Sequence, residues 1–415
     1  MVKRTDMKKL ITLLTVVAAL AACDKAYDPA DVPGAFEGRR DGGEAMAADG
    51  DYGDPSDPGG EGNGQQGQAG IVTAGEWNDL DNWPFWGALM TSVSDEQTTG
   101  YSQYSGDWKF WTNRRVAVLV KNDNGQPEPG VKVELRAGSE KIWSAVTDVF
   151  GRADCWVGLY DPQYQDGGLS LALDESVMPE APAVTTWEDE DVAMNEYVHN
   201  RMGSLSSNAQ ILFIVDATGS MQDEIDFLKE DLVNILQQVV PKKDNKIATG
   251  ALFYRDEGDR YVTKTSDFAD DYNKTVNFIK KQYAEGGGDY PEAVHTALEV
   301  SLQHFKWDAS ARTRLAFMLL DAPPHINHEG VIESLQKSIE LYAAQGIKLI
   351  PVASSGVDKS TEFCLRFFAI STGGTYVFLT NDSGVGNDHI IPTVGKYKVE
   401  QLNDLMVRLI LKYLG

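Results

Sequence analysis

The sequence predicts an α/β protein: a doubly wound, mostly parallel open sheet over residues 209–415, preceded by a small all-β sandwich over residues 76–180. In the C-terminal half, short apolar runs alternate with longer stretches in which apolar residues recur at helical spacing. This alternation is typical of a parallel sheet covered by helices. Between residues 116 and 159, short runs of alternating character are separated by turn residues, which is typical of antiparallel strands.

Residues 1–22 have the order of a secretory signal peptide: a basic start, an apolar run from residue 10 and a small-residue ending. The apolar run is shorter than the about 20 residues of a membrane-spanning helix. Its ending, Leu20-Ala21-Ala22-Cys23, resembles the lipobox of bacterial lipoproteins. This resemblance implies cleavage before Cys23 and a lipid on its sulfur, which would anchor the protein to a membrane. The alternative is an ordinary cleaved signal with an incidental cysteine.

Residues 23–75 are rich in Gly and Asp and lack a helical or strand period. This composition predicts a disordered, acidic tether. Together with the lipid anchor, it predicts a location in the cell envelope. Asp24 would indicate inner-membrane retention in some lineages, whereas acidic residues near the cysteine favour surface export in others. The outer membrane or cell surface is the favoured expectation.

The chain has 37 basic and 62 acidic residues, a net charge of −25. Such an excess of negative charge argues against nucleic acid as a partner. Of the three cysteines, Cys155 and Cys364 fall in different predicted domains, so no disulfide framework is expected.

The stretch from residue 76 to 180 opens with an aromatic cluster and continues with runs typical of strands near 116–120, 131–135, 142–147 and 153–159. The spacing of Gly130-Val131, Thr147-Asp148 and Gly151 resembles a carboxypeptidase regulatory-like sandwich. The aromatic residues either contact a carbohydrate or protein or, as we favour, pack a core. Residues 181–208 are expected to form a connector with helical character around Glu188–His199.

The run of residues 209–215 is apolar throughout, as in a parallel strand buried on both faces. Apolar residues from Met221 to Val239 then recur at helical spacing. Further strands are expected near 247–253, 315–320, 347–353 and 375–379. Further helices are expected near 269–283, 291–305, 332–344, 362–371 and 399–411.

Three loops carry candidate metal ligands at the carboxyl ends of these predicted strands, where open α/β sheets bind ligands. Asp216-Ala217-Thr218-Gly219-Ser220 resembles the D-x-[ST]-x-S signature of the metal-ion-dependent adhesion site in von Willebrand factor A and integrin domains. The loop of residues 286–292, with Asp289 and Glu292, resembles the second metal loop of integrin β subunits. Asp321 follows an apolar strand and occupies the place of the third loop's aspartate.

The chemistry of Asp216, Thr218 and Ser220, one carboxylate and two hydroxyls, suits a hard cation. We expect Mg²⁺, with Mn²⁺ or Ca²⁺ as substitutes, and further oxygens from Glu292, Asp289 and Asp321. The resemblance implies that a protein or matrix partner offers an acidic side chain to the ion, and that the protein binds and is not an enzyme.

Asp223 and Glu224 either hold a second adjacent ion, as the integrin resemblance implies, or complement the partial positive charge of the helix N-terminus. The number of ions therefore stays open at this stage. The candidates for the rim of the site are Tyr290, His325, Asn327 and Arg255. The alternative, which we favour for each of them, is an ordinary loop or capping residue.

Two other classes of function are open. One is a metal-dependent hydrolase. A hydrolase of the haloacid dehalogenase type would need an aspartate at the position of Thr218. A zinc enzyme could use His325 and His328, but the loop offers no third zinc ligand beside them. The chain has neither a Walker loop nor a G-x-S-x-G elbow. An envelope scaffold that leaves the metal site unused is the other alternative.

Overall fold

The computed structural model describes residues 68–93, 100–239 and 246–415. The predicted signal peptide, Cys23 and the tether up to residue 67 lie outside these described residues. No helix within the described ranges is long and apolar enough to cross a membrane.

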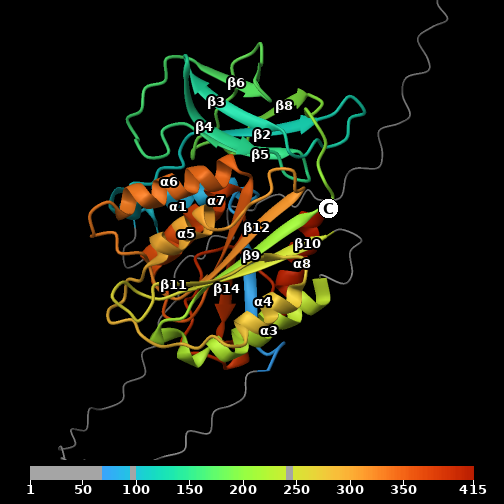
Figure 1. Cartoon of the computed structure of the whole chain (residues 1–415). Coiled ribbons are helices and arrows are strands. Elements are labelled where there is room, and N and C mark those ends of the chain that lie inside the picture. The colour runs from blue at the N-terminus through green and yellow to red at the C-terminus, as the bar shows by residue number, and fades with distance from the viewer. Residues whose placement is uncertain (1–67, 94–99, 240–245) are drawn as a thin grey trace, which may run out of the picture. The chain divides into compact units, whose positions relative to one another are not determined.

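An eight-stranded sheet, in the order β11-β10-β9-β12-β13-β14-β1-β15, forms the centre of the C-terminal half (Figure 1). Its five central strands, β10, β9, β12, β13 and β14, pair in parallel, and the strands at both edges pair antiparallel. The sequence prediction of a mostly parallel sheet is therefore confirmed. The strands are β1 (Thr73–Trp77), β9 (Ala209–Asp216), β10 (Ile247–Tyr254), β11 (Thr263–Ala269), β12 (Thr313–Leu320), β13 (Ile347–Ala353), β14 (Tyr376–Thr380) and β15 (Glu400–Gln401).

Helices cover both faces of this sheet. Successive residues of a strand point to opposite faces, so a central strand such as β9 contributes apolar side chains to the cores on both sides. Leu212 and Ile214 of β9 join the apolar core beneath α5, α6 and α7. Their neighbours Ile211 and Phe213 join the core beneath α3, α4 and α8. The helices are α3 (Ile225–Val239), α4 (Tyr272–Ile279), α5 (Val294–Gln303), α6 (Val331–Ala344), α7 (Lys359–Thr372) and α8 (Leu402–Leu414), with short 3₁₀ turns η2 (Gly219–Asp223) and η4 (Asn381–Ser383).

The predicted C-terminal boundary of the tether, residue 75, is wrong, because β1 of the main sheet already begins at Thr73. It pairs antiparallel with β14 from Thr73↔Thr380 to Trp77↔Tyr376. Val72 and Ala74 are buried in the core beneath α8. A strand of five residues with few large side chains has no clear signal in a polar, Gly-rich stretch, and its pairing partner lies some three hundred residues away.

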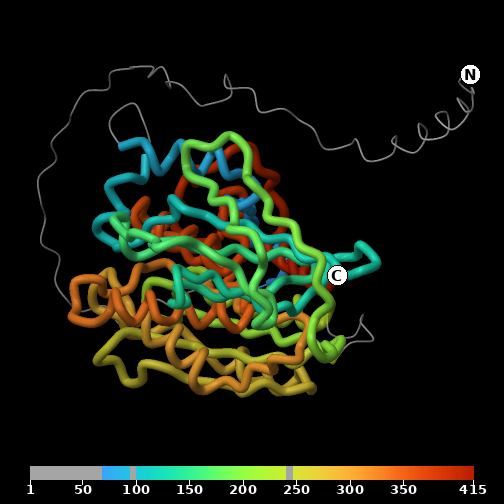
Figure 2. The backbone as a smooth tube through the Cα atoms, turned by 90° about the horizontal axis from the view of Figure 1, so that it is seen from above, coloured from blue at the N-terminus to red at the C-terminus, as the bar shows by residue number. Residues whose placement is uncertain are grey.

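Residues 115–198 contribute two small sheets, one in the order β5-β2-β8 and the other β4-β3-β6-β7. Figure 2 shows their teal and green strands lying over the C-terminal half. The pairing of β3 with β4 and of β2 with β5 is antiparallel, as the sequence predicted. The strands are β2 (Arg115–Lys121), β3 (Lys132–Ala137), β4 (Glu140–Val146), β5 (Arg152–Trp156), β6 (Leu169–Leu173), β7 (Ser176–Val177) and β8 (Met194–Val198).

The helical character expected around Glu188–His199 is wrong. Residues 194–198 form β8, which pairs in parallel with β2 from Ala117↔Met194 to Lys121↔Val198. Asn195 is buried between exposed neighbours and donates its side-chain amide to the carbonyl of Ala117 at 3.0 Å. The extended conformation of residues 194–198 is fixed by pairing with the edge of β2. The acidic composition of this segment gives no sign of that pairing.

The aromatic cluster near residue 83 packs a core, but that core is shared with the C-terminal half. It lies on α1 (Trp83–Thr91), α2 (Ser102–Trp108) and the residues that follow. Trp86 stacks on Phe363 of α7 with centroids 6.1 Å apart, and Phe110 stacks on Phe367 at 3.8 Å. The prediction of core packing is confirmed, whereas the expectation that this segment belongs to a separate β unit is not.

Candidate metal site

The first and third candidate loops meet because their strands are neighbours. Asp216 is the last residue of β9, Asp321 directly follows β12, and the two strands pair in parallel. The second loop joins them through the backbone N–H of Glu292, which donates to the carbonyl of Pro323 at 2.8 Å. The three loops thus lie together at the carboxyl edge of the sheet, as predicted.

Hydrogen bonds within the first loop bring its three side chains together. Oδ1 of Asp216 accepts from the backbone N–H of Thr218 at 2.9 Å and from its hydroxyl at 2.7 Å. The hydroxyl oxygens of Thr218 and Ser220 are 3.1 Å apart. Oδ2 of Asp216 is buried and has no hydrogen-bond partner. One carboxylate oxygen therefore remains to bind a cation beside two hydroxyls.

Glycine is required where the second loop passes the first. The N–H of Gly219 donates to the carbonyl of Gly286 at 3.0 Å, which holds the two loops together. Gly287 has a φ of +74°, and a Cβ on it would lie 2.9 Å from Oε1 of Glu292 and 3.4 Å from Cβ of Thr218. A side chain at Gly287 would be strained and would press on two candidate ligands.

Asp216, Glu292 and Asp321 form a buried acidic group, with 0%, 2% and 4% of their surfaces exposed. Burial has the largest effect and repulsion from the neighbouring carboxylates the next. Together they raise the pKa of Glu292 to about 9 and that of Asp321 to about 8. Burial raises the pKa of Asp216 to about 6, against the hydrogen bonds from Thr218. Buried carboxylates normally have hydrogen-bonded or charged partners. Here one oxygen of each has none, so the set fits a cation.

Asp289 is exposed and lies with Asp256 and His325, and the three offer ligand atoms within 4.8 Å of one another. Nε2 of His325 is 2.6 Å from Oδ1 of Asp256. Asp256 was not predicted from the sequence, although it lies two residues beyond the end of β10 and so at the same edge of the sheet as Asp216. Its charge also raises the pKa values of Asp216 and Glu292.

Asp223 and Glu224 have protein partners. Oδ2 of Asp223 accepts from the backbone and side-chain amides of Asn387, at 2.7 and 2.6 Å. Oε1 of Glu224 accepts from the N–H of Ser355 at 2.9 Å and lies 3.1 Å from Nε2 of His389. The second oxygen of each carboxylate is buried without a partner. These contacts connect both residues to loops that follow β13 and β14.

Three of the four predicted rim residues, Tyr290, His325 and Asn327, line a cavity of about 260 Å³ beside the loops. Arg255 does not belong to the rim. It is 1% exposed, pairs with Glu285 at 2.9 Å and lies over the ring of Tyr261. Trp108 of α2 lines the same cavity, and its place there was not predicted because α2 lies far from all three loops along the chain.

Comparison with known proteins identifies the domain that carries the site. Residues 210–349 match the family model of the von Willebrand factor A domain. An ariadne-like RING finger protein of Acanthamoeba polyphaga mimivirus is 28% identical over 188 residues, covering 41% of this chain and 18% of the relative. The alpha-protein kinase vwkA of Dictyostelium discoideum is 32% identical over 123 residues, covering 29% of this chain and 19% of the relative. The chain thus spans less than a fifth of the length of either curated relative.

Two solved structures show weaker similarity. Proximal thread matrix protein 1 of the mussel byssus is 14% identical, with a TM-score of 0.30 and coverage of 41% of both chains. The pilus adhesin SpaC of Lactobacillus rhamnosus GG, in an open conformation, is 11% identical, with a TM-score of 0.32 and coverage of 42% of this chain and 28% of that chain. On the family match and the mostly parallel sheet, the C-terminal half of this chain contains a von Willebrand factor A domain.

Proposed function

We propose that this protein is a lipid-anchored cell-envelope protein that binds a protein or matrix partner through a divalent-metal site, and that it is not an enzyme. The supporting observation is the group of Asp216, Glu292 and Asp321, three buried carboxylates that each keep an unpartnered oxygen. Von Willebrand factor A domains commonly mediate adhesion or protein binding, and they often bind a divalent metal.

Asp216, Thr218, Ser220, Glu292 and Asp321 would hold the ion, for which Mg²⁺ is the proposed identity because the donors are all oxygens. Bound there, the ion would supply positive charge for an acidic side chain of the partner. The loops around it would select the partner, with Tyr290 and His325 lining the adjacent cavity.

The anchor is proposed from the sequence of residues 1–23. Lipidation at Cys23 would hold the mature chain at the outer membrane or cell surface, with the acidic segment after it as a tether. The binding domain would then project toward a partner outside the membrane.

The test is affinity capture from detergent-solubilised envelopes with the mature protein as bait, in Mg²⁺ and in chelator. We expect a partner that is retained in Mg²⁺ and released by chelator, and that Thr218→Ala no longer retains. Thr263→Ala on the edge strand β11 is the control and should behave as wild type. Retention that is equal in Mg²⁺ and in chelator would refute the proposal.

A further inference from the structure

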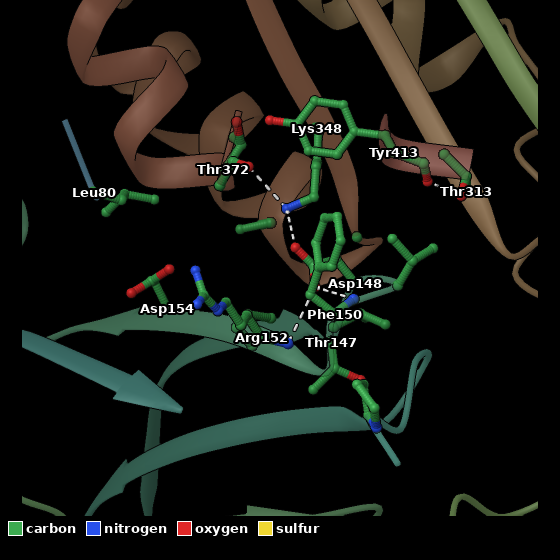
Figure 3. Close-up of a pocket in the computed structure, with 18 of the residues that line it drawn as sticks. Leu80, Thr147, Asp148, Phe150, Arg152, Asp154, Thr313, Lys348, Thr372 and Tyr413 are labelled. Atoms are coloured by element: carbon green, nitrogen blue, oxygen red, sulfur yellow. Dashed lines mark hydrogen bonds and ion pairs between the residues drawn. The ribbon is translucent and has the colours of Figure 1, made fainter. Parts of the chain in front are cut away.

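A cavity beside the small sheets, drawn in Figure 3, is lined by the amino ends of β12 and β13. Asp216 lies at the other, carboxyl edge of the main sheet. The cavity has a volume of about 510 Å³ and is lined by β2, β4 and β5 on one side. On the other side are the amino ends of β12 and β13 and the last turns of α7 and α8. Since β12 has eight residues, the cavity is about 25 Å from the metal loops. Its volume is typical of small-molecule sites.

Three acidic residues line this cavity, and each pairs with a basic residue of the same lining. Asp154 lies 2.7 Å from Nε of Arg115, and Asp148 lies 3.1 Å from Nζ of Lys348. Asp81 pairs more loosely with Arg152, at 3.5 Å. Figure 3 shows Lys348 reaching from the main sheet to Asp148, and a dashed line marks their ion pair. The acidic charge of the lining is therefore compensated.

Four further basic residues line the cavity, and one of them, Lys121, pairs with Glu196 outside it at 2.8 Å. The other three are Arg312, Arg314 and Lys412. In the part of the chain that the structure describes, no Asp or Glu side chain lies within 4.0 Å of the charged nitrogens of these three. A chain with a net charge of −25 thus concentrates positive charge at this cavity.

Arg314 lines the cavity with a guanidinium whose charge has no carboxylate within 4.0 Å among the described residues. It is 5% exposed, its Nη1 donates to the carbonyls of Asp308 and Ala311 at 2.8 Å each, and its Nε is buried without a partner. A guanidinium that is left short of an acceptor is costly in a protein interior. Guanidinium groups bind carboxylates and phosphates through several N–H donors at once.

We propose that this cavity binds a small organic anion that has a carboxylate or phosphate group and an apolar part. Arg312, Arg314 and Lys412 bind the anionic group. The apolar part packs on Leu80, Val146 and Val149 of the same lining. Because the lining comes from both the small sheets and the main sheet, the ligand stabilises the contact between them.

The experiment measures binding to the mature full chain by calorimetry and by thermal unfolding, with four probes: inorganic phosphate, hexanoate, hexyl phosphate and uncharged hexanol. We expect hexanoate or hexyl phosphate to bind, and to bind more tightly than hexanol. Arg312→Glu and Lys412→Glu, both at exposed positions, should weaken that binding about tenfold or more. Lys274→Glu, an exposed residue of α4 outside the cavity, should leave it unchanged.

The comparison of hexanoate with hexyl phosphate decides between a carboxylate and a phosphate ligand. Binding of inorganic phosphate alone would overturn the assignment of an apolar part. Failure of all three anions to bind, or equal affinity in wild type and the two charge-reversal variants, would overturn the proposal. Native mass spectrometry of protein purified from its own envelope supplies a separate readout, a retained anion that Arg312→Glu loses.

Discussion

Asp79 and Arg366 form a buried ion pair between residues 287 positions apart. Nε of Arg366 donates to Oδ2 of Asp79 at 2.9 Å, and Nη2 donates to Oδ1 at 2.5 Å. The two side chains are 1% and 0% exposed. Asp79 lies just after β1 and Arg366 lies on α7, so the pair joins the N-terminal segment to the helix on which the aromatic cluster packs.

We predict that Asp79→Ala lowers the free energy of unfolding by about 3–5 kcal/mol, because it removes the closer carboxylate partner of the buried Arg366 and leaves only Glu362, at 3.9 Å. Asp81→Ala is the matched control. Asp81 pairs with Arg152 at 3.5 Å in an exposed position, so its loss should cost about 0–1 kcal/mol. Urea denaturation measures both values, and equal costs for the two variants would contradict the role of the buried pair.

Asp231 of α3 makes stability depend on pH. Its Oδ1 accepts from the N–H of Gly70 at 2.6 Å, and burial raises its pKa from 3.8 to about 7. An acid whose pKa is higher in the folded state binds its proton more tightly there. The contribution of Asp231 to the free energy of unfolding is therefore largest below pH 3.8 and falls as the pH rises through 7.

Asp231→Asn should remove this dependence, so the variant gains stability relative to wild type as the pH rises from about 4 to about 7. Asp226→Asn, an exposed carboxylate on the same helix, is the control and should follow the wild-type profile. Urea denaturation at pH 5 and at pH 8 tests this. Parallel pH profiles for wild type and Asp231→Asn would show that the carboxyl does not titrate as described.

Gly287→Ala should lower Mg²⁺ affinity about 10–100-fold, the range for residues that support metal ligands. Its Cβ would press on Glu292 and Thr218. Gly258→Ala is the control, because Gly258 also has a positive φ, +90°, but a Cβ added there would meet no atom within 4 Å. Both variants carry the same kind of backbone strain, so calorimetry that found equal Mg²⁺ affinities would contradict the steric argument.

The sequence was sufficient to predict the parallel strands and the helices that cover the main sheet, because buried strands such as β9 and β12 are apolar throughout and amphipathic helices have a clear period. It did not predict α1 and α2. It predicted Asp216, Thr218, Ser220, Glu292 and Asp321 as neighbours, since the carboxyl ends of parallel strands share one edge of a sheet. These predictions depend on local patterns and one topological rule.

Elements stabilised by distant contacts were not predictable in this way. β1 and β8 are short and have weak patterns, and each is fixed by pairing with a strand far along the chain. Asp256 and Trp108 reach the surroundings of the site only through the tertiary fold. The pairing of Asp79 with Arg366 likewise has no sequence signature.

Lipidation is testable by mass spectrometry of the mature protein. We predict a chain that begins at Cys23 with a diacylglyceryl group on sulfur and fractionates with membranes. Cys23→Ser should yield protein without the lipid, while Cys155→Ser, which changes a buried thiol, should leave lipidation unaffected. Detection of an unmodified Cys23, or of retained residues 10–22 in the mature chain, would refute the anchor.

The central claim is tested most directly by calorimetric titration of the purified mature protein with Mg²⁺. We predict binding by wild type, and a rise of about 2.7 kcal/mol in the free energy of unfolding at a hundredfold excess over Kd. Asp216→Ala should remain folded and lose both effects, because it removes a buried, unpartnered carboxylate oxygen. Asp226→Ala, an exposed carboxylate on α3, should retain both. Unchanged Mg²⁺ affinity in Asp216→Ala would contradict the account.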